Sequence, residues 1–340
     1  MTAVKWGLVG FGEQAKRMCS ALRKLKDVEI NAVCCSSENR RREAEQSLEV
    51  RAYGKFSEFL ANPEIQVVYI ATPHHLHTPQ AFKAVEAGKH VLVEKPMALS
   101  VDGAHKLIDA AKRKNVVLGV NCPLRQHPAL QELKQVIQNR LMGEIVQLHV
   151  YLGRKGLQRE GWWRDQFHSG PMCLMDLGVQ GIDLLLWLVG ERALEVTSLG
   201  CGGKDDQTLN VSITVTINFP GGAQGVSSAN NLAKSSPGFI LVQGTEMQTL
   251  AELDWPEGDG SLKLKRSKAG IEEEKNCEPI DLFMAAARNF NSAVIGEAGY
   301  SPCGEENYPV VETCCAAIES LKNGKTVRAG EIQRVSGQRF

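Results

Sequence analysis

Over the first 120 residues, short apolar runs alternate with longer stretches in which apolar positions recur every three or four residues. This alternation predicts βαβ units around a parallel sheet. The expected strands are Val4–Val9, Glu29–Cys34, Val67–Ala71, His90–Val93 and Val116–Val120, and the expected helices are Glu13–Leu25, Glu38–Gln46, His75–Ala87 and Ser100–Lys114. Ser100 is a good N-cap for the last of these helices.

The pattern changes after Asn121. Helices are expected at Ala129–Arg140 and Leu174–Val189 around a strand at Ile145–Tyr151, followed by strands with no helix between them at Glu195–Gly200, Thr208–Phe219, Gln224–Ala229, Phe239–Gln243 and Leu262–Arg266. Strands that follow one another in this way form antiparallel sheets. The tail returns to helix at Ile280–Ile295 and Tyr308–Lys322.

A chain of 340 residues exceeds what one hydrophobic core usually serves, so two domains are expected. Residues 1–121 are predicted to form an α/β Rossmann domain that binds a dinucleotide. Residues 122–340 are predicted to form an α+β domain with a largely antiparallel open sheet, which binds substrate and supports oligomerisation. The C-terminal helix could pack back on the first domain.

Composition narrows the range of partners. The chain carries 39 basic and 39 acidic residues, so no overall electrostatic field exists to hold nucleic acid or an anionic membrane.

The start of the sequence lacks the apolar core of a secretory signal, and no apolar run nears the length of a membrane span, which favours a soluble cytoplasmic protein. The ten cysteines and the histidines at 74, 75 and 77 lack the spacing or acidic partners of a metal site, so reduced thiols and no metal are expected.

A glycine-rich turn follows the first expected strand. Its residues are Gly10, Phe11, Gly12, Glu13, Gln14 and Ala15. Gly10 permits a tight turn, Gly12 lets a pyrophosphate approach the backbone, and Ala15 allows the following helix to pack closely on the strand. The helix N-terminus then offers N–H groups to the phosphates. This context favours dinucleotide binding over a glycine turn of purely structural meaning.

The end of the second expected strand indicates which cofactor is bound. An NAD-dependent protein usually places Asp or Glu there, whereas this chain has Cys34, Cys35, Ser36 and Ser37. Arg40, Arg41 and Arg42 follow within one helical turn. Two hydroxyls and a guanidinium can hold a 2'-phosphate, so NADP(H) is expected rather than NAD(H). The alternative is that the arginines form a solvated helix face, which must hold for at least one of them.

Three further segments resemble the Gfo/Idh/MocA family of glucose-fructose oxidoreductase and inositol dehydrogenase relatives. They are Thr72-Pro73-His74-His75-Leu76-His77, Glu94-Lys95-Pro96 and Asp176-x-Gly178-x-Gln180-x-x-Asp183, in the family's order with the glycine turn. The match covers nearly the whole chain. The resemblance implies a Rossmann oxidoreductase acting on a sugar, polyol or similar compound. It also implies cofactor contacts from Thr72, Pro73, His74, His77, Glu94, Lys95, Pro96 and Asn121.

Lys95 is the expected catalytic residue of the first domain. It lies at the carboxyl end of a parallel strand, where ligands bind in doubly wound sheets. Beside a cationic nicotinamide, a lysine becomes able to exchange protons near neutral pH. The alternative for an isolated lysine is a solvated surface charge.

Asp176, Gln180 and Asp183 are spaced i, i+4 and i+7 and therefore share one helix face. By resemblance, Asp176 binds a substrate hydroxyl and Asp183 orients the side chain at position 180. Most relatives have histidine there as the general acid/base, and some have tyrosine. Glutamine cannot carry a proton near neutral pH, so either Lys95 carries it alone or the protein catalyses a different step.

Three other residues resemble the family's substrate-contacting positions. Arg125 follows Asn121 in the segment between the domains, and Trp163 and Arg164 precede the helix that bears Asp176. Adjacent tryptophans could equally be packing residues.

The sequence thus predicts reversible hydride transfer between NADP(H) and a secondary alcohol or its ketone, with substrate held by Lys95 and the Asp176/Gln180 face. A non-catalytic NADP(H)-binding regulator is the alternative, because of Gln180. A sheet with one face bare of helices also favours a homodimer or homotetramer formed through the C-terminal domain.

Overall fold

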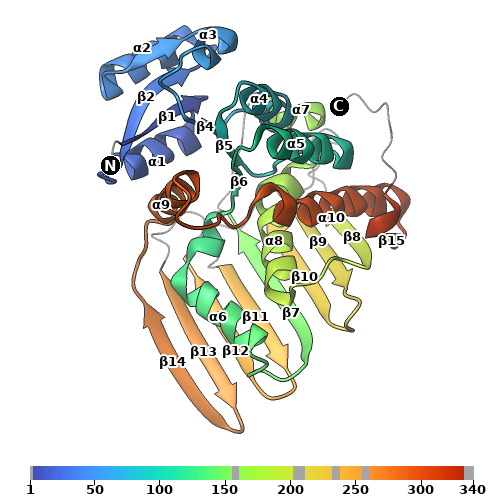
Figure 1. Cartoon of the computed structure of the whole chain (residues 1–340). Helices are drawn as coiled ribbons and strands as arrows, with labels where there is room; N and C mark the ends of the chain where they lie inside the picture. Colours follow the sequence, from blue (N-terminus) through green and yellow to red (C-terminus); the bar gives the residue numbers. More distant parts are fainter. Residues whose placement is uncertain (1–2, 155–160, 202–210, 232–237, 255–260, 333–340) are drawn as a thin grey trace. The chain divides into compact units, whose positions relative to one another are not determined.

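The computed structural model describes residues 3–154, 161–201, 211–231, 238–254 and 261–332 (Figure 1). Contacts within the chain divide it into two units. The first contains Met1–Pro123 and Phe283–Tyr308, and the second contains Leu124–Leu282 and Pro309–Phe340. The expected domain boundary after residue 121 stays a prediction, and these contacts add residues 283–308 to the first unit.

A parallel sheet in the order β3-β2-β1-β4-β5-β6 forms the centre of the first unit. The strands are β1 (Val4–Val9), β2 (Val28–Cys34), β3 (Arg51–Tyr53), β4 (Val67–Ile70), β5 (His90–Glu94) and β6 (Leu118–Asn121). All residues of β4, β5 and β6 except His90 are buried, as expected for strands covered on both faces. This strand order is that of the Rossmann fold.

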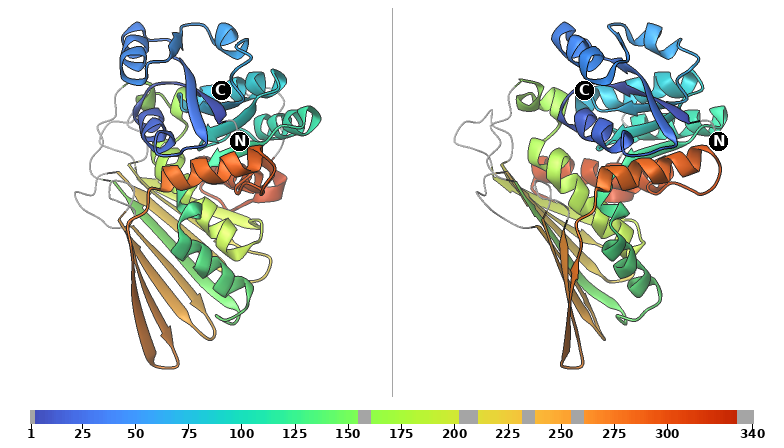
Figure 2. Two further views of the ribbon diagram at one scale, coloured as in Figure 1. Left: turned by 60° about the vertical axis from the view of Figure 1, so that its left-hand side comes forward. Right: turned by 90° about the vertical axis from the view of Figure 1, so that its left-hand side faces the viewer.

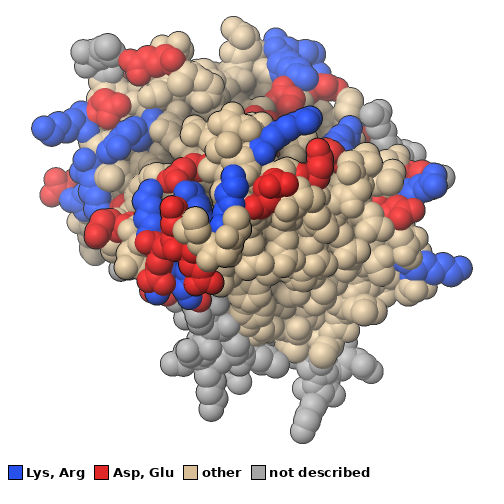
Figure 3. All heavy atoms as spheres, turned by 90° about the horizontal axis from the view of Figure 1, so that it is seen from below, with Lys and Arg blue, Asp and Glu red and all other residues tan. Residues whose placement is uncertain are grey.

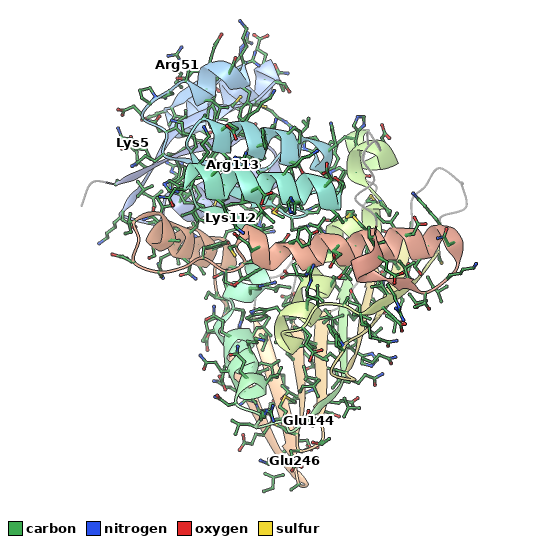
Figure 4. All side chains as sticks on the ribbon, turned by 45° about the vertical axis from the view of Figure 1, so that its right-hand side comes forward. Lys5, Arg51, Lys112, Arg113, Glu144 and Glu246 are labelled. Atoms are coloured by element: carbon green, nitrogen blue, oxygen red, sulfur yellow. The ribbon has the colours of Figure 1, made fainter. Side chains whose placement is uncertain are left out.

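Helices complete the described part of this unit, the last of them beginning at Leu282, at the edge of the second unit. They are α1 (Glu13–Leu22), α2 (Glu38–Leu48), α3 (Phe56–Leu60), α4 (His74–Glu86), α5 (Val101–Lys114) and α9 (Leu282–Val294). Phe290 of α9 packs edge-on against Trp6 of β1 at 5.6 Å between ring centroids, which explains why this late segment belongs to the first unit. Lys112 and Arg113 of α5 are labelled in Figure 4: Lys112 pairs with Glu305 at 3.3 Å, and Arg113 pairs with Glu86 of α4 at 3.4 Å.

A nine-stranded sheet forms the second unit, in the order β14-β13-β12-β11-β7-β10-β9-β8-β15. Its strands are β7 (Ile145–Gly153), β8 (Glu195–Cys201), β9 (Ser212–Asn218), β10 (Gln224–Asn230), β11 (Gly238–Gly244), β12 (Gln248–Leu253), β13 (Leu262–Lys268), β14 (Ile271–Cys277) and β15 (Val327–Arg328). All neighbours are antiparallel except β7 and β10, which are parallel. The sheet is therefore mixed. Helices separate β7 from β8 and β9 along the chain, and β10, which follows these two strands, pairs with β7.

Helices cover one face of this sheet (Figures 1 and 2). They are α6 (Pro128–Gln138), α8 (Val179–Val189) and α10 (Gly304–Asn323), whose first residues belong to the first unit. The second unit also contains α7 (Gln166–Ser169) and short 3-10 turns at Gly161–Arg164 and Ala329–Glu331, and another such turn, Pro123–Gln126, begins at the end of the first unit. Buried and partly exposed residues alternate along β9, β10 and β11, the pattern of a sheet with one open face. The predicted fold class is confirmed for both units.

The charged side chains do not gather by sign on the surface drawn in Figure 3, where acidic and basic groups are interspersed beside a broad uncharged area. None of the helices in the described parts of the chain combines the length and apolar composition that a bilayer span requires.

Candidate functional site

Polar residues gather at the carboxyl ends of the first unit's strands and, separately, around α8 in the second unit.

The glycine turn has the geometry that a dinucleotide site needs. Gly10 has a φ of +93°, and a Cβ there would lie 2.4 Å from the carbonyl oxygen of Ala71, so only glycine fits. A Cβ on Gly12 would have as its nearest neighbour a terminal nitrogen of Arg40 at 4.0 Å. The backbone at Gly12 is therefore open, and a guanidinium lies near it. Gly12 is the N-cap residue of α1 and supplies no side-chain cap, which leaves the N–H groups of the first turn for an anion.

The other residues of the turn have distinct surroundings. Phe11 is buried and lies under the ammonium group of Lys16, at 5.5 Å from the ring centroid. Glu13 is exposed, Gln14 is half-buried, and Ala15 is fully buried where α1 packs on the sheet. The small residue at position 15 thus has the packing role that its place in the motif predicts.

The three arginines after β2 have different surroundings. Arg41 donates to the backbone carbonyls of Cys35 and Ser36 at 2.9 and 2.7 Å, and Arg42 pairs with Glu38 on the exposed surface of α2. Arg40 is exposed, with its guanidinium near the Gly12 position. The Ser37 hydroxyl caps α2 by accepting from the backbone N–H of Arg40. Arg41 thus shapes the loop, and Arg40 is the arginine best placed for a phosphate.

His77 of α4 connects the two loops that follow β4 and β5. Its Nδ1 lies 2.8 Å from the carbonyl oxygen of Pro96, and its Nε2 lies 2.8 Å from that of Thr72. His74 packs edge-on against it at 5.5 Å between ring centroids. Pro73 is the N-cap residue of α4. The ring holds the Thr72-Pro73 and Lys95-Pro96 segments at a fixed separation.

The environment of His77 makes stability depend on pH. Burial, opposed by hydrogen bonds to both carbonyls, lowers its pKa to about 4. In the unfolded chain, histidine titrates near pH 6.5. The contribution of neutral His77 to the free energy of unfolding is therefore complete above that pH and is lost as the pH falls toward 4. We expect the free energy of unfolding to fall by about 3 kcal/mol over this range because of His77. Urea unfolding at several pH values measures it, with His77→Gln as the variant that cannot titrate. Equal losses in both proteins would contradict the assignment.

A second buried group lies where β4, β5 and β6 end. The carboxylate of Glu94 accepts from the hydroxyl of Tyr69 at 2.5 Å and from Nδ2 of Asn121 at 2.7 Å. Lys95, next along the chain, is half-buried. The Oδ1 atom of Asn121 is buried and accepts no hydrogen bond from the described residues. An acceptor in this state fits a donor from a bound ligand, such as the amide or hydroxyl groups of a nicotinamide nucleoside. Tyr69 was not among the expected site residues, because its apolar neighbours in β4 mark it as a core residue.

In the second unit, Arg125 and Asp183 form a buried pair with two parallel hydrogen bonds. Nε donates to Oδ2 at 2.8 Å and Nη2 to Oδ1 at 2.7 Å, and both side chains are almost fully buried. The guanidinium also lies over the ring of Trp187. Both oxygens of Asp183 are thus occupied by Arg125. This geometry gives Asp183 the task of holding Arg125, whereas the resemblance implied that it orients Gln180.

Asp176 and Gln180 belong to a helix with an irregular start. Leu174–Gly178 form a π-helical turn that continues into α8. The Gln180 amide donates to the backbone carbonyl of Asp176 at 3.2 Å. The Asp176 carboxylate accepts from Arg154 at 3.1 Å, and both side chains are buried. Arg154 follows the last residue of β7, and sequence analysis missed it because the expected strand ended at Tyr151.

Trp162 and Trp163 stack on each other in the 3-10 turn before α8, with centroids 4.0 Å apart and planes at 27°. Both are half-buried. The side chain of Arg164 lies outside the described residues. Among the residues that the structure describes, no group of three or more His, Cys, Asp or Glu side chains could hold a metal ion.

Comparison with known proteins identifies the class. Residues 4–122 match an oxidoreductase family with an NAD-binding Rossmann fold, and residues 130–248 match the GFO/IDH/MocA C-terminal domain. The chain therefore belongs to the GFO/IDH/MocA oxidoreductase family, and the resemblance of its motifs is confirmed.

Similar proteins include reductases and dehydrogenases. The 1,5-anhydro-D-fructose reductase of Ensifer adhaerens is 23% identical over 97% of this chain and 98% of its own. A levoglucosan dehydrogenase solved with NADH shares the fold at a TM-score of 0.86, with 22% identity over 96% of this chain and 99% of that one. A 3-ketoreductase from Actinomadura kijaniata solved with NADP gives a TM-score of 0.85, with 18% identity over 94% and 98% of the two chains.

Proposed function

We propose that the protein is an NADP(H)-dependent oxidoreductase that transfers a hydride to or from a secondary alcohol or ketone of a sugar, polyol or related compound. The observation that carries the proposal is the open backbone at Gly12 with Arg40 beside it, in a Rossmann sheet whose fifth strand ends at Glu94, directly before Lys95. The named activities of similar reductases and dehydrogenases support the substrate class.

Each part of the chain then has a defined task. The nicotinamide, when bound, supplies or accepts the hydride. The turn at Gly10 and Gly12 holds the pyrophosphate, and Asn121 offers an acceptor to the nicotinamide nucleoside. Lys95 gives or takes the proton of the reacting oxygen. Asp176, which pairs with Arg154, accepts a hydrogen bond from a substrate hydroxyl, and Gln180 orients the substrate without exchanging a proton.

Lys95 and Asp176 belong to different units, and the proposal includes the expectation that they act on the same substrate. Arg125 takes part through Asp183, whose pairing fixes its guanidinium. Trp163 and Arg164 are proposed to line the substrate side.

The preference for NADP(H) rests on Ser36, Ser37 and Arg40, since no carboxylate ends β2. Similar structures contain NADH in one case and NADP in another, so the choice depends on this chain's own residues.

Replacing Arg40 by alanine should weaken NADPH binding by roughly tenfold or more and leave NADH binding nearly unchanged, because a charge-assisted contact to the 2'-phosphate is lost. Fluorescence titration with both reduced cofactors measures this. Arg42→Ala is the matched control, since Arg42 pairs with Glu38. Tighter NADH than NADPH binding by the wild type, or an equal loss in the control, would show that Arg40 does not select the cofactor.

A screen of sugars, polyols and keto-sugars with NADP+ and NADPH, followed by the absorbance of reduced nicotinamide, tests the function itself. We expect turnover of at least one such compound.

The second candidate function is a regulator that binds NADP(H) without turnover. Gln180, at the position where most relatives carry the proton, favours it. Tight NADPH binding with no turnover across the screen would support the regulator and contradict the enzyme.

The open face of the second unit's sheet supports a proposed homodimer or homotetramer. Tyr151 of β7 and Phe239 of β11 stack there at 5.6 Å, both only partly buried within the chain. Burying such a face against another copy removes apolar area from water. A monomer in analytical ultracentrifugation would contradict this proposed oligomer.

All ten cysteines are free thiols, which supports a reducing, cytoplasmic compartment. Cell fractionation tests this location.

A further inference from the structure

Glu94, at the end of β5, receives hydrogen bonds from the strands on both sides. Tyr69 of β4 is paired with Leu92 in the parallel ladder, so its side chain shares a sheet face with that of Glu94, two residues further along β5. The Tyr69 hydroxyl donates to Oε1 of Glu94 at 2.5 Å. Asn121 is paired with Glu94 in the ladder of β5 and β6, and its Nδ2 donates to the same oxygen at 2.7 Å. One carboxylate oxygen thus takes donors from both neighbouring strands.

This contact fixes the direction in which the Asn121 amide points. A carboxylate only accepts hydrogen bonds, whereas an amide has a donor end and an acceptor end. The donor end, Nδ2, therefore turns toward Glu94, and the acceptor end, Oδ1, points away from it. Turning the amide over would set two oxygens against each other and leave buried polar groups unsatisfied. Glu94 is 5% exposed and Asn121 is fully buried, so bulk water does not compete for either end of the amide.

The acceptor end is the part of Asn121 that a ligand can use. Its Oδ1 is buried and accepts no hydrogen bond from any of the described residues. It belongs to the half of the sheet formed by β4, β5 and β6. Because the glycine turn after β1 and the end of β2 serve the pyrophosphate and the adenosine, this other half is left for the nicotinamide nucleoside.

The fixed direction of the amide indicates which group of the ligand meets it. A ribose hydroxyl can donate or accept, so it would adapt to either end of the Asn121 amide. A carboxamide N–H2 only donates and requires the acceptor end. Since Oδ1 is screened from water, a donor that reaches it makes a strong hydrogen bond, and a ligand without a donor leaves it unsatisfied.

We propose that Glu94 is a positioning residue that presents Oδ1 of Asn121 to the carboxamide N–H2 of the nicotinamide, so that the site selects a carboxamide over a ring substituent without an N–H donor. The inference rests on the proposed function only in placing a nicotinamide dinucleotide at these strand ends. It gives Glu94 a task different from the direct cofactor contact that the resemblance implied.

The acetylpyridine analogue of NADP+ tests this selection, because a methyl group replaces only the nitrogen of the carboxamide. We expect the wild type to bind NADP+ roughly tenfold or more tighter than the analogue, since the analogue leaves Oδ1 of Asn121 buried without a donor. Isothermal titration calorimetry measures both dissociation constants without any substrate. The same comparison between NAD+ and its acetylpyridine analogue removes the 2'-phosphate from the test, so the result does not depend on which cofactor the protein prefers.

Variants of Glu94 identify the group that holds the amide. In Glu94→Met no acceptor holds Nδ2 of Asn121, so the ratio of the two dissociation constants should fall toward one. Glu94→Gln keeps an oxygen that can accept from both Tyr69 and Asn121, and it should keep most of the ratio. Tyr300→Phe is the matched control, because Tyr300 is also buried and its hydroxyl donates to the backbone carbonyl of Val120 at 3.3 Å. The control should keep the whole ratio.

Asn121→Ala keeps the test decisive if Glu94→Met fails to fold. It should lower the affinity for NADP+ to that for the analogue and leave the affinity for the analogue nearly unchanged. Equal binding of NADP+ and the analogue by the wild type would overturn the proposal, as would an undiminished ratio in Asn121→Ala or in folded Glu94→Met. A loss of the ratio in Glu94→Gln or Tyr300→Phe as large as in Glu94→Met would also overturn it, because the acceptor oxygen would then not be the cause.

Turnover separates this inference from the proposed function. If the wild type binds NADP+ more tightly than the analogue but turns over no alcohol or ketone, the role of Glu94 stands and the proposed function fails. If an alcohol or ketone is turned over while NADP+ and the analogue bind equally, the proposed function stands and the role of Glu94 fails.

Discussion

Replacing Lys95 by alanine is expected to lower kcat by about 100-fold or more on any compound that the protein turns over, since general acid/base catalysis typically contributes that much. Lys95 has no titratable substitute at position 180, where Gln180 stands. NADPH affinity should change little. Steady-state kinetics together with a separate cofactor titration distinguish the two effects.

Gln180→Ala is the companion variant. Losing one orienting hydrogen bond costs about 1 to 3 kcal/mol, which corresponds to a roughly 5- to 150-fold loss of turnover with little change in the pH profile. Wild-type turnover in Lys95→Ala would mean that the proton comes from water or from the substrate itself. A larger pH effect in Gln180→Ala than in Lys95→Ala would give the acid–base role to the second unit.

Replacing Asp183 by asparagine is expected to destabilise the protein by about 3 to 5 kcal/mol, because it leaves the buried guanidinium of Arg125 without its counter-charge. Both hydrogen bonds of this pair end on the Asp183 carboxylate, and neither side chain reaches water. Chemical unfolding of the full chain measures the effect.

The control for this variant is an exposed pair in the same unit. Arg328 and Glu331 lie 3.6 Å apart with most of both side chains in water, so Arg328→Ala should cost less than about 1 kcal/mol. A double variant, Arg125→Met with Asp183→Leu, should recover part of the stability lost in Asp183→Asn, since no charge is then left unpaired. A loss in Asp183→Asn as small as that in the control would show that Arg125 reaches water in solution.

The sequence by itself determined most elements of the first unit, because their signals are local. The strands from Val4, His90 and Val67 are apolar runs, and the turn at Gly10 requires a positive φ that glycine supplies. Ser37 and Ser100 cap α2 and α5 with side-chain hydrogen bonds, as their positions indicate. The family motifs lie in order on these elements, so the glycine turn at the start of α1 follows from the sequence alone.

Elements without a local pattern were missed. No strand was expected at β3, β12 or β14, and no helix at α3. The strand β14 reads Ile-Glu-Glu-Glu-Lys-Asn-Cys and is exposed along nearly all its length, so it has no apolar alternation to detect. It is held by its backbone ladder to β13 and by pairs such as Lys263 with Glu274 at 2.7 Å. The parallel pairing of β7 with β10 was missed for a similar reason: strand direction depends on which strands meet.

Only the tertiary structure decided which polar side chains meet. The motifs marked Glu94, Asp176 and Asp183 as functional, but their partners Tyr69, Arg154 and Arg125 stand 25, 22 and 58 positions away along the chain. Tyr69 and Arg154 carry no signal of their own, because a tyrosine in an apolar strand and an arginine after a strand are ordinary residues. Hydrogen bonds between buried groups form where strand register and helix packing bring the atoms within 3 Å, and that distance is a property of the fold and not of any segment alone.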